Sequence, residues 1–136
     1  MCSLGADIHG ACLCGAVRFR LTPPLRDVFL CHCDQCRKWS GHFWAATSVP
    51  LDPFHLDAGG DVRWYAATSH ARRGFCRRCG SSLFWQPTYE PRISVAAGAL
   101  EKPTGLSLAE VADWCGGLDV REGTRLSKLA SKAVPA

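Results

Sequence analysis

The chain alternates apolar and polar residues over short stretches, with the period of two that is typical of β-strands with one buried face. Residues 16–21 show this most clearly, because apolar residues alternate with Arg18 and Arg20 before Pro23 ends the stretch. Further strands are predicted over residues 28–30, 43–49, 54–56, 62–65, 71–75, 83–85 and 93–97. Glycine or proline separates most of these stretches. We therefore expect a mainly β fold, antiparallel and built of short strands with little helix.

Helical patterns are short and few: we expect helix at residues 35–39 and at residues 108–113. A length of 136 residues is ordinary for one domain, which we place at residues 1–120. Residues 121–136 are polar and lack periodicity, so we expect them to form a mobile C-terminal tail.

Seven of the nine cysteines fall in three tight clusters: Cys12-x-Cys14, Cys31-x-Cys33-x-x-Cys36 and Cys76-x-x-Cys79. Zinc takes four ligands in a structural site and keeps one position open in a catalytic site. Two pairs make a closed site, whereas a triplet makes an open one. We therefore predict two zinc ions per chain, a structural ion held by Cys12, Cys14, Cys76 and Cys79 and a catalytic ion held by Cys31, Cys33 and Cys36.

The spacings within the clusters suit ligands of one ion. Alternate side chains of an extended segment point the same way, so we expect Cys12 and Cys14 to face a metal from one strand. In the C-x-x-C pair a tight turn brings the sulfurs together, helped by Gly80, which tolerates positive φ. His32, between two cysteines of the triplet, should face away from the metal and is not expected to be a ligand.

Other uses of the cysteines stay open. The first residues have neither the basic start nor the apolar stretch of a signal peptide, so we expect a cytoplasmic protein, where clustered thiols more often bind metal than form disulfides. A disulfide scaffold remains an alternative, as does an iron–sulfur cluster on the triplet with Cys2 or Cys115 as its fourth ligand. Cys115 could instead complete the second zinc site, which would then be structural as well.

Charge and composition narrow the class further. Apolar residues make up 47% of the chain, and no stretch reaches the roughly 18 apolar residues of a membrane span, so we expect no membrane association. The formal charge of +4 counts every cysteine as neutral. Seven thiolates remove seven charges and two zinc ions return four, so the charge falls to about +1. We therefore do not expect nucleic-acid binding, and the arginine pairs at residues 72–73 and 77–78 are interpreted as solvated patches.

Four segments carry a resemblance to a known family. They are residues 10–17 (GACLCGAV), 31–41 (CHCDQCRKWSG), 75–81 (FCRRCGS) and 93–100 (ISVAAGAL). In the order and spacing of all seven cysteines, the chain resembles the glutathione-dependent formaldehyde-activating enzyme family, which includes centromere protein V. The resemblance covers roughly residues 8–115 and implies a zinc-bound, tent-like β fold, with the two pairs at the structural site and the triplet at the catalytic one.

The resemblance implies a carbon–sulfur lyase that joins formaldehyde and glutathione to S-hydroxymethylglutathione, or acts on another small thiol and aldehyde. Three thiolates give a zinc site a formal charge of −1, which weakens it as a Lewis acid. We expect Arg37 or Lys38 to offset that charge and to meet substrate carboxylates. The alternative is a non-catalytic zinc module that binds a protein or nucleic acid.

Overall fold

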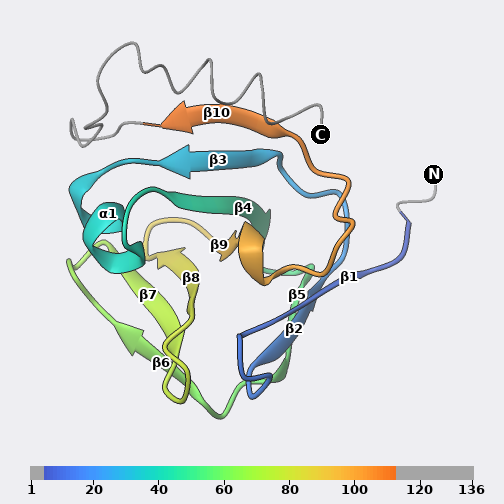
Figure 1. Cartoon of the computed structure of the whole chain (residues 1–136), viewed down its shortest axis with the longest axis horizontal. Helices are drawn as coiled ribbons and strands as arrows, with labels where there is room; N and C mark the ends of the chain where they lie inside the picture. The colour runs from blue at the N-terminus through green and yellow to red at the C-terminus, as the bar shows by residue number, and fades with distance from the viewer. Residues whose placement is uncertain (1–4, 113–136) are drawn as a thin grey trace.

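The computed structural model describes residues 5–112, which form two β-sheets and one short α-helix (Figure 1). The strands are β1 (Ile8–Ala11), β2 (Arg18–Leu21), β3 (Val28–Cys31), β4 (Trp44–Pro50), β5 (Phe54–Ala58), β6 (Val62–Tyr65), β7 (Ala71–Cys76), β8 (Ser82–Pro87), β9 (Arg92–Ala96) and β10 (Leu108–Ala112). The helix α1 spans Asp34–Ser40, and a 3-10 turn η1 spans Ala97–Ala99. Within residues 5–112, no helix has the length and apolar character needed to span a membrane.

Neighbouring strands are mostly antiparallel, which confirms the predicted fold class. One sheet has the order β1-β2-β5, and the other has the order β10-β3-β4-β9-β8-β7-β6. The exception is β10, which pairs parallel to β3 at the edge of the larger sheet and runs beside it in Figure 1. A domain is predicted over residues 1–120, and the part of it that the structure describes contains both sheets. The predicted tail at residues 121–136 lies outside the described residues.

Two groups of buried apolar side chains form the core. The larger one lies where the two sheets meet, and the rings of Phe19 and Phe84 contact each other there at a centroid distance of 5.2 Å. Phe19 and Leu21 are both almost fully buried, as the alternation in residues 16–21 predicts. The smaller group surrounds the start of α1 and includes Phe29 and Trp44. Each group contains cysteines of one predicted metal site, so each site packs against buried apolar side chains.

The last described element differs from the prediction. Residues 108–112 form strand β10, not part of a helix, because their backbone pairs with the open edge of β3, with Val111 opposite Leu30. A backbone hydrogen bond just before β10, from the Val28 amide to the Ser107 carbonyl at 2.8 Å, holds the incoming segment against β3. Tertiary pairing thus overrides the local pattern.

The start of the first predicted strand also needs correction, and one strand was missed before it. Strand β2 begins at Arg18 because Val17 still belongs to the turn that precedes it: the Cys12 amide donates to the Val17 carbonyl at 3.1 Å. Strand β1, which pairs with β2, was not predicted. Its four residues include Gly10 and His9, so they show no alternation strong enough to indicate a strand.

Gly10 tests how tightly β1 packs on the core. A Cβ atom at this position would lie 2.4 Å from Cζ of Phe19 and 3.0 Å from the Ala99 carbonyl oxygen. We expect Gly10→Ala to lower the free energy of unfolding by about 1–3 kcal/mol through overpacking, measured by denaturant unfolding. Gly60→Ala is the control, because no atom lies within 4 Å of its added carbon. Similar losses in both variants would contradict the tight packing.

Candidate metal centres and cavity

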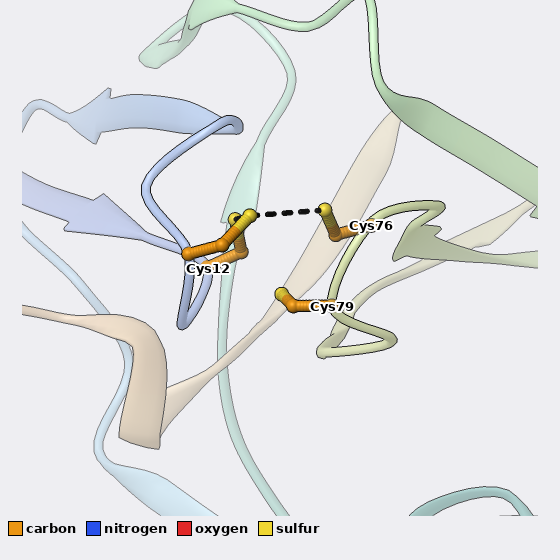
Figure 2. A group of neighbouring side chains, drawn as sticks. Cys12, Cys76 and Cys79 are labelled. Atoms are coloured by element: carbon orange, nitrogen blue, oxygen red, sulfur yellow. Dashed lines mark hydrogen bonds between the residues drawn. The ribbon is translucent and has the colours of Figure 1, made fainter.

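The four paired cysteines converge on one point although they come from distant parts of the chain. Figure 2 shows Cys76 and Cys79 pointing from one turn toward Cys12 on another. All four sulfur atoms lie within 4.8 Å of one another. The Cys12–Cys14 sulfur distance is 3.6 Å and the Cys14–Cys76 distance is 3.8 Å. Zn–S bonds of about 2.3 Å in a tetrahedron give an edge of about 3.8 Å, so the arrangement fits a tetrahedral thiolate site.

Tight turns bring these cysteines together, and Cys76 is the last residue of strand β7 before the second turn. Cys14 lies in the turn between β1 and β2, where the Gly15 amide donates to the Cys12 carbonyl at 3.1 Å. The expectation that Cys12 and Cys14 project from one extended segment is therefore wrong. The Gly80 amide closes the second turn on the Cys76 carbonyl at 2.8 Å. Gly15 and Gly80 have φ of 82° and 79°, the left-handed conformation that glycine adopts most readily.

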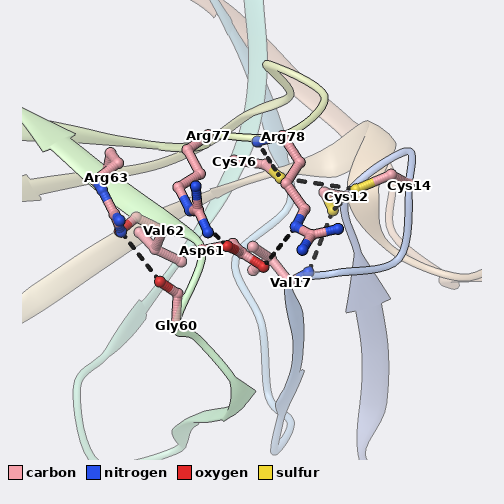
Figure 3. A network of polar contacts seen from close by, with 10 residues as sticks. All are labelled: Cys12, Cys14, Val17, Gly60, Asp61, Val62, Arg63, Cys76, Arg77 and Arg78. Atoms are coloured by element: carbon pink, nitrogen blue, oxygen red, sulfur yellow. Dashed lines mark hydrogen bonds and ion pairs between the residues drawn. The ribbon is translucent and has the colours of Figure 1, made fainter.

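Hydrogen-bond donors surround the sulfur atoms. The backbone amides of Val17 and Arg78 donate to the sulfurs of Cys12 and Cys76, each at 3.3 Å (Figure 3). Hydrogen bonds from the hydroxyl and the backbone amide of Ser81 are the main causes that lower the pKa of Cys79 to about 5. Donors of this kind favour the thiolate, which is the form that binds metal. The donor set therefore fits a metal ion as well as the sulfur spacing does.

An acidic residue fixes the second turn to strand β6. Arg77 and Arg78 both contact the Asp61 carboxylate, at 2.6 Å and 3.2 Å from their Nε atoms (Figure 3). The Arg77 amide also donates to the Asp61 carbonyl at 2.8 Å. The two arginines were interpreted as a solvated patch, and the structure gives them a carboxylate partner. Because Arg77 and Arg78 lie between Cys76 and Cys79 in the sequence, this group of charged side chains lies beside the four-cysteine cluster.

The triplet is built by a strand end and the helix that follows it. Cys31 is the last residue of β3, Cys33 caps the start of α1, and Cys36 lies in the first turn of α1. The Cys36 amide donates to the Cys33 sulfur at 3.4 Å. The three sulfurs lie within 4.8 Å of one another. Among residues 5–112 no fourth histidine, cysteine or acidic ligand joins this group, and Cys2 and Cys115 lie outside that range.

His32 separates two ligands of the triplet without joining them. Its side chain is fully buried, and its ring lies 5.5 Å from the rings of both His42 and Phe43. The candidate metal-binding group contains Cys31, Cys33 and Cys36 but not His32. This arrangement is the one expected for alternate residues at the end of a strand.

A buried arginine lies against the triplet. Arg73 of β7 is only 4% exposed, and its Nη1 lies 3.8 Å from the Cys36 sulfur while Nη2 donates to Oε1 of Gln35 at 3.2 Å. The pKa of Cys36 is lowered to about 6, first by a hydrogen bond from the Cys31 thiol and then by the Arg73 charge. The same pairing with Cys36, together with burial, raises the pKa of Cys31.

The interpretation of Arg73 as part of a solvated patch is wrong, because its side chain is buried. Its neighbour Arg72 fits that interpretation: it is exposed, stacks over Trp64 at 4.0 Å and donates to Gln86. Successive side chains of a strand point to opposite faces. Two adjacent arginines within a predicted strand therefore imply that one of them points inward, and this signal was available in the sequence.

The triplet opens into a cavity of about 700 Å³. Its polar lining includes Arg73, Arg92 and Ser48, and its apolar walls include Trp44 and Trp85. Arg92 donates from Nε and Nη2 to the Ser48 hydroxyl at 3.3 Å and 3.0 Å, which fixes the guanidinium at the wall. The volume is typical of small-molecule sites.

Arg37 and Lys38 do not line this cavity, although we expected one of them to meet the substrate. Both lie in the second half of the short helix α1, beyond the turn that carries Cys36. The lining arginines come instead from other segments: they are Arg26, Arg73 and Arg92.

Known proteins share this arrangement of sequence and fold. The model of the glutathione-dependent formaldehyde-activating enzyme family matches residues 7–116. A Halomonas elongata protein named "Putative glutathione-dependent formaldehyde-activating enzyme" is 33% identical over 123 residues, 79% of this chain and 78% of that protein. An uncharacterized lyase of Schizosaccharomyces pombe is 32% identical over 82 residues, 60% of this chain; the match spans 59% of the lyase's length.

A solved structure is similar as well. The crystal structure of a Rhodobacter sphaeroides protein matches with a TM-score of 0.60 and 25% identity, over 74% of this chain and 99% of that one. The family match covers most of the chain, including all seven clustered cysteines. The chain therefore belongs to the glutathione-dependent formaldehyde-activating enzyme family, as its motifs predict.

Asp61 offers a test of how the second turn is held. Asp61→Asn removes the charge that pairs with Arg77 and Arg78. Because both arginines are half exposed or more, we expect a loss of only about 1 kcal/mol of unfolding free energy. Thermal unfolding at low and high salt measures it, and the difference from the parent should shrink at high salt. Asp52→Asn, at an exposed turn position, is the control. A loss independent of salt would contradict an ionic clamp.

Proposed function

We propose that the chain is a zinc-dependent carbon–sulfur lyase that acts on the adduct of an aldehyde with a small thiol, such as S-hydroxymethylglutathione from formaldehyde and glutathione. The chain is a lyase-type enzyme by this proposal, in line with its family and with the lyase name of one relative. The observation that carries the proposal is the position of the three-cysteine group in the wall of a cavity of about 700 Å³.

The two cysteine groups have different roles in this proposal. Cys12, Cys14, Cys76 and Cys79 hold a structural zinc ion, since four sulfurs complete a tetrahedron. Cys31, Cys33 and Cys36 hold a second ion and leave one ligand position toward the cavity. A zinc ion there would supply Lewis-acid chemistry, by lowering the pKa of a thiol or by polarising a carbonyl group.

The reaction needs no oxidant or reductant. In the synthetic direction the thiol sulfur bonds to the aldehyde carbon, and the thiol proton ends on the former carbonyl oxygen. In the lyase direction that carbon–sulfur bond breaks. The protein's task is to hold two small molecules in contact and to favour a thiolate, and placing reactants together lowers the entropic part of the barrier.

The cavity lining suits an anionic thiol. The guanidinium of Arg92 is held by Ser48 and lines the same cavity as the triplet. Guanidinium groups bind carboxylates with two parallel hydrogen bonds. Trp44 and Trp85 form apolar walls that exclude water from the reacting atoms. Arg92 therefore takes the substrate-carboxylate role that we first assigned to Arg37 or Lys38.

Serine substitutions test the division between the two metal sites. Cys76 is fully buried and joins two distant segments, so Cys76→Ser should lose about 3 kcal/mol or more of unfolding free energy. Cys33→Ser should lose about 1 kcal/mol or less, because serine also caps a helix well. Cys33→Ser should also lose one of the two zinc ions and the lyase activity. Zinc analysis, thermal unfolding and exchange NMR of formaldehyde with glutathione measure these effects. Equal destabilisation by the two substitutions would contradict the division.

The catalytic claim has its own direct test. The zinc-loaded protein should accelerate the exchange between free glutathione and its hydroxymethyl adduct above the uncatalysed rate, and Cys33→Ser should return the rate to the uncatalysed value. A folded protein with two zinc ions and no acceleration would favour the non-catalytic zinc module instead.

Arg92→Gln tests recognition of the substrate carboxylate. We expect KM for glutathione to rise about tenfold with little change in kcat, because one charge-assisted hydrogen-bond pair is lost. The rate with 2-mercaptoethanol, which has no carboxylate, should be unchanged. Arg72→Gln is the matched control, since Arg72 is exposed and does not line the cavity. An equal effect on both thiols would show that Arg92 does not bind the carboxylate.

A further inference from the structure

We propose that Arg73 is the counter-charge of the three-cysteine site and that its guanidinium enables this site to accept an anionic fourth ligand. The inference rests on the proposed metal ion at the triplet. It concerns a positioning residue, because Arg73 acts through Cys36.

The burial of Arg73 requires an anion nearby. An arginine side chain stays charged in a protein, and a buried charge is costly unless it is paired. Arg73 is only 4% exposed, and among residues 5–112 no carboxylate lies within 4.0 Å of its guanidinium. Its hydrogen-bond partners are the Cys36 sulfur and the neutral amide oxygen of Gln35. The cysteine triplet is thus the anion that this guanidinium faces.

Charge counting shows what the pairing changes. Three thiolates and one divalent ion carry a formal charge of −1, and a thiolate as fourth ligand would make the total −2. With Arg73 beside Cys36, the totals become zero and −1. Opposite charges attract more strongly away from bulk water, so a buried cation beside Cys36 lowers the cost of bringing a negative ligand to the site.

Among the residues that the structure describes, no buried cation lies against the sulfurs of the four-cysteine site. The hydrogen bonds to its sulfurs from outside the group come, in the described part of the chain, from backbone amides and from the hydroxyl of Ser81. The nearby side chains of Arg77 and Arg78 share the single carboxylate of Asp61 and are half exposed or more, so their charges are solvated and not buried against a sulfur. A buried counter-charge therefore distinguishes the triplet, which opens to a cavity, from the closed site.

The two hydrogen bonds also fix where the counter-charge lies. One N–H group points to the Cys36 sulfur and another holds Gln35 in the first turn of α1. Arg73 comes from β7, which also ends in Cys76 of the other site. A single strand therefore contributes a ligand to one site and the charge to the other.

The test compares an anionic with a neutral ligand at a cobalt-substituted triplet. Cobalt(II) replaces zinc in the full-length protein, and 2-mercaptoethanol or imidazole is titrated at one pH while the visible ligand-field and charge-transfer bands are recorded. The variants are Arg73→Gln, Arg73→Met and Arg73→Lys. Arg72→Gln on the same strand is the control.

We expect both neutral variants to bind the thiol about tenfold more weakly or worse, with imidazole binding within twofold of the parent. Arg73→Lys should restore most of the thiol affinity, because the charge is kept, and Arg72→Gln should match the parent. Equal weakening for both ligands, or no weakening, would overturn the proposal. So would failure of both neutral variants to fold, since the role would then be structural.

The same titration separates this proposal from the proposed function. If Cys33→Ser leaves the cobalt bands and their response to thiol unchanged, the triplet does not hold the metal, and the proposed function fails with the inference. If that variant abolishes the response while the Arg73 variants behave like the parent, only the role of Arg73 is wrong.

Discussion

The convergence of four sulfurs from two distant turns is the constraint on which the rest of the structure depends. Cys14 and Cys76 are 62 residues apart, and their sulfurs lie 3.8 Å from each other. One turn belongs to the three-stranded sheet and the other to the seven-stranded sheet. A metal ion at this point joins the two sheets over their shared core, and such an ion contributes directly to folding. In the function that we propose, four sulfurs leave no ligand position for chemistry there, and the reaction takes place at the other site.

The triplet has the opposite character, because its three cysteines lie within six residues of each other at a strand end and a helix start. The triplet connects only residues that are close in sequence, so it does not hold distant segments of the chain together. Its environment is also different: the triplet opens into a cavity, and the buried guanidinium of Arg73 lies against Cys36 in the wall of that cavity. These features are the reason why we propose that the triplet exchanges a ligand, whereas the four-cysteine group holds its ion permanently.

Much of this was predictable from the sequence, and the exceptions have physical causes. Cysteine spacing predicts both ligand groups because spacing within a turn is a local property, and the alternation at Phe19 and Leu21 predicts a buried strand face. Strand β10 depends on pairing with the distant β3, which local periodicity does not contain. Arg73 reaches the triplet only because β7 passes behind α1, so its role depends on tertiary structure. The predicted alternatives for Cys2 and Cys115 concern residues outside the described range.

The measurement that tests the central claim most directly is anomalous X-ray diffraction at the zinc edge on crystals of the full-length protein. The account predicts two zinc peaks per chain, one with four sulfur neighbours and one with three sulfurs and a ligand from outside the protein. A single peak, or a second ion closed by a fourth protein ligand, would contradict it.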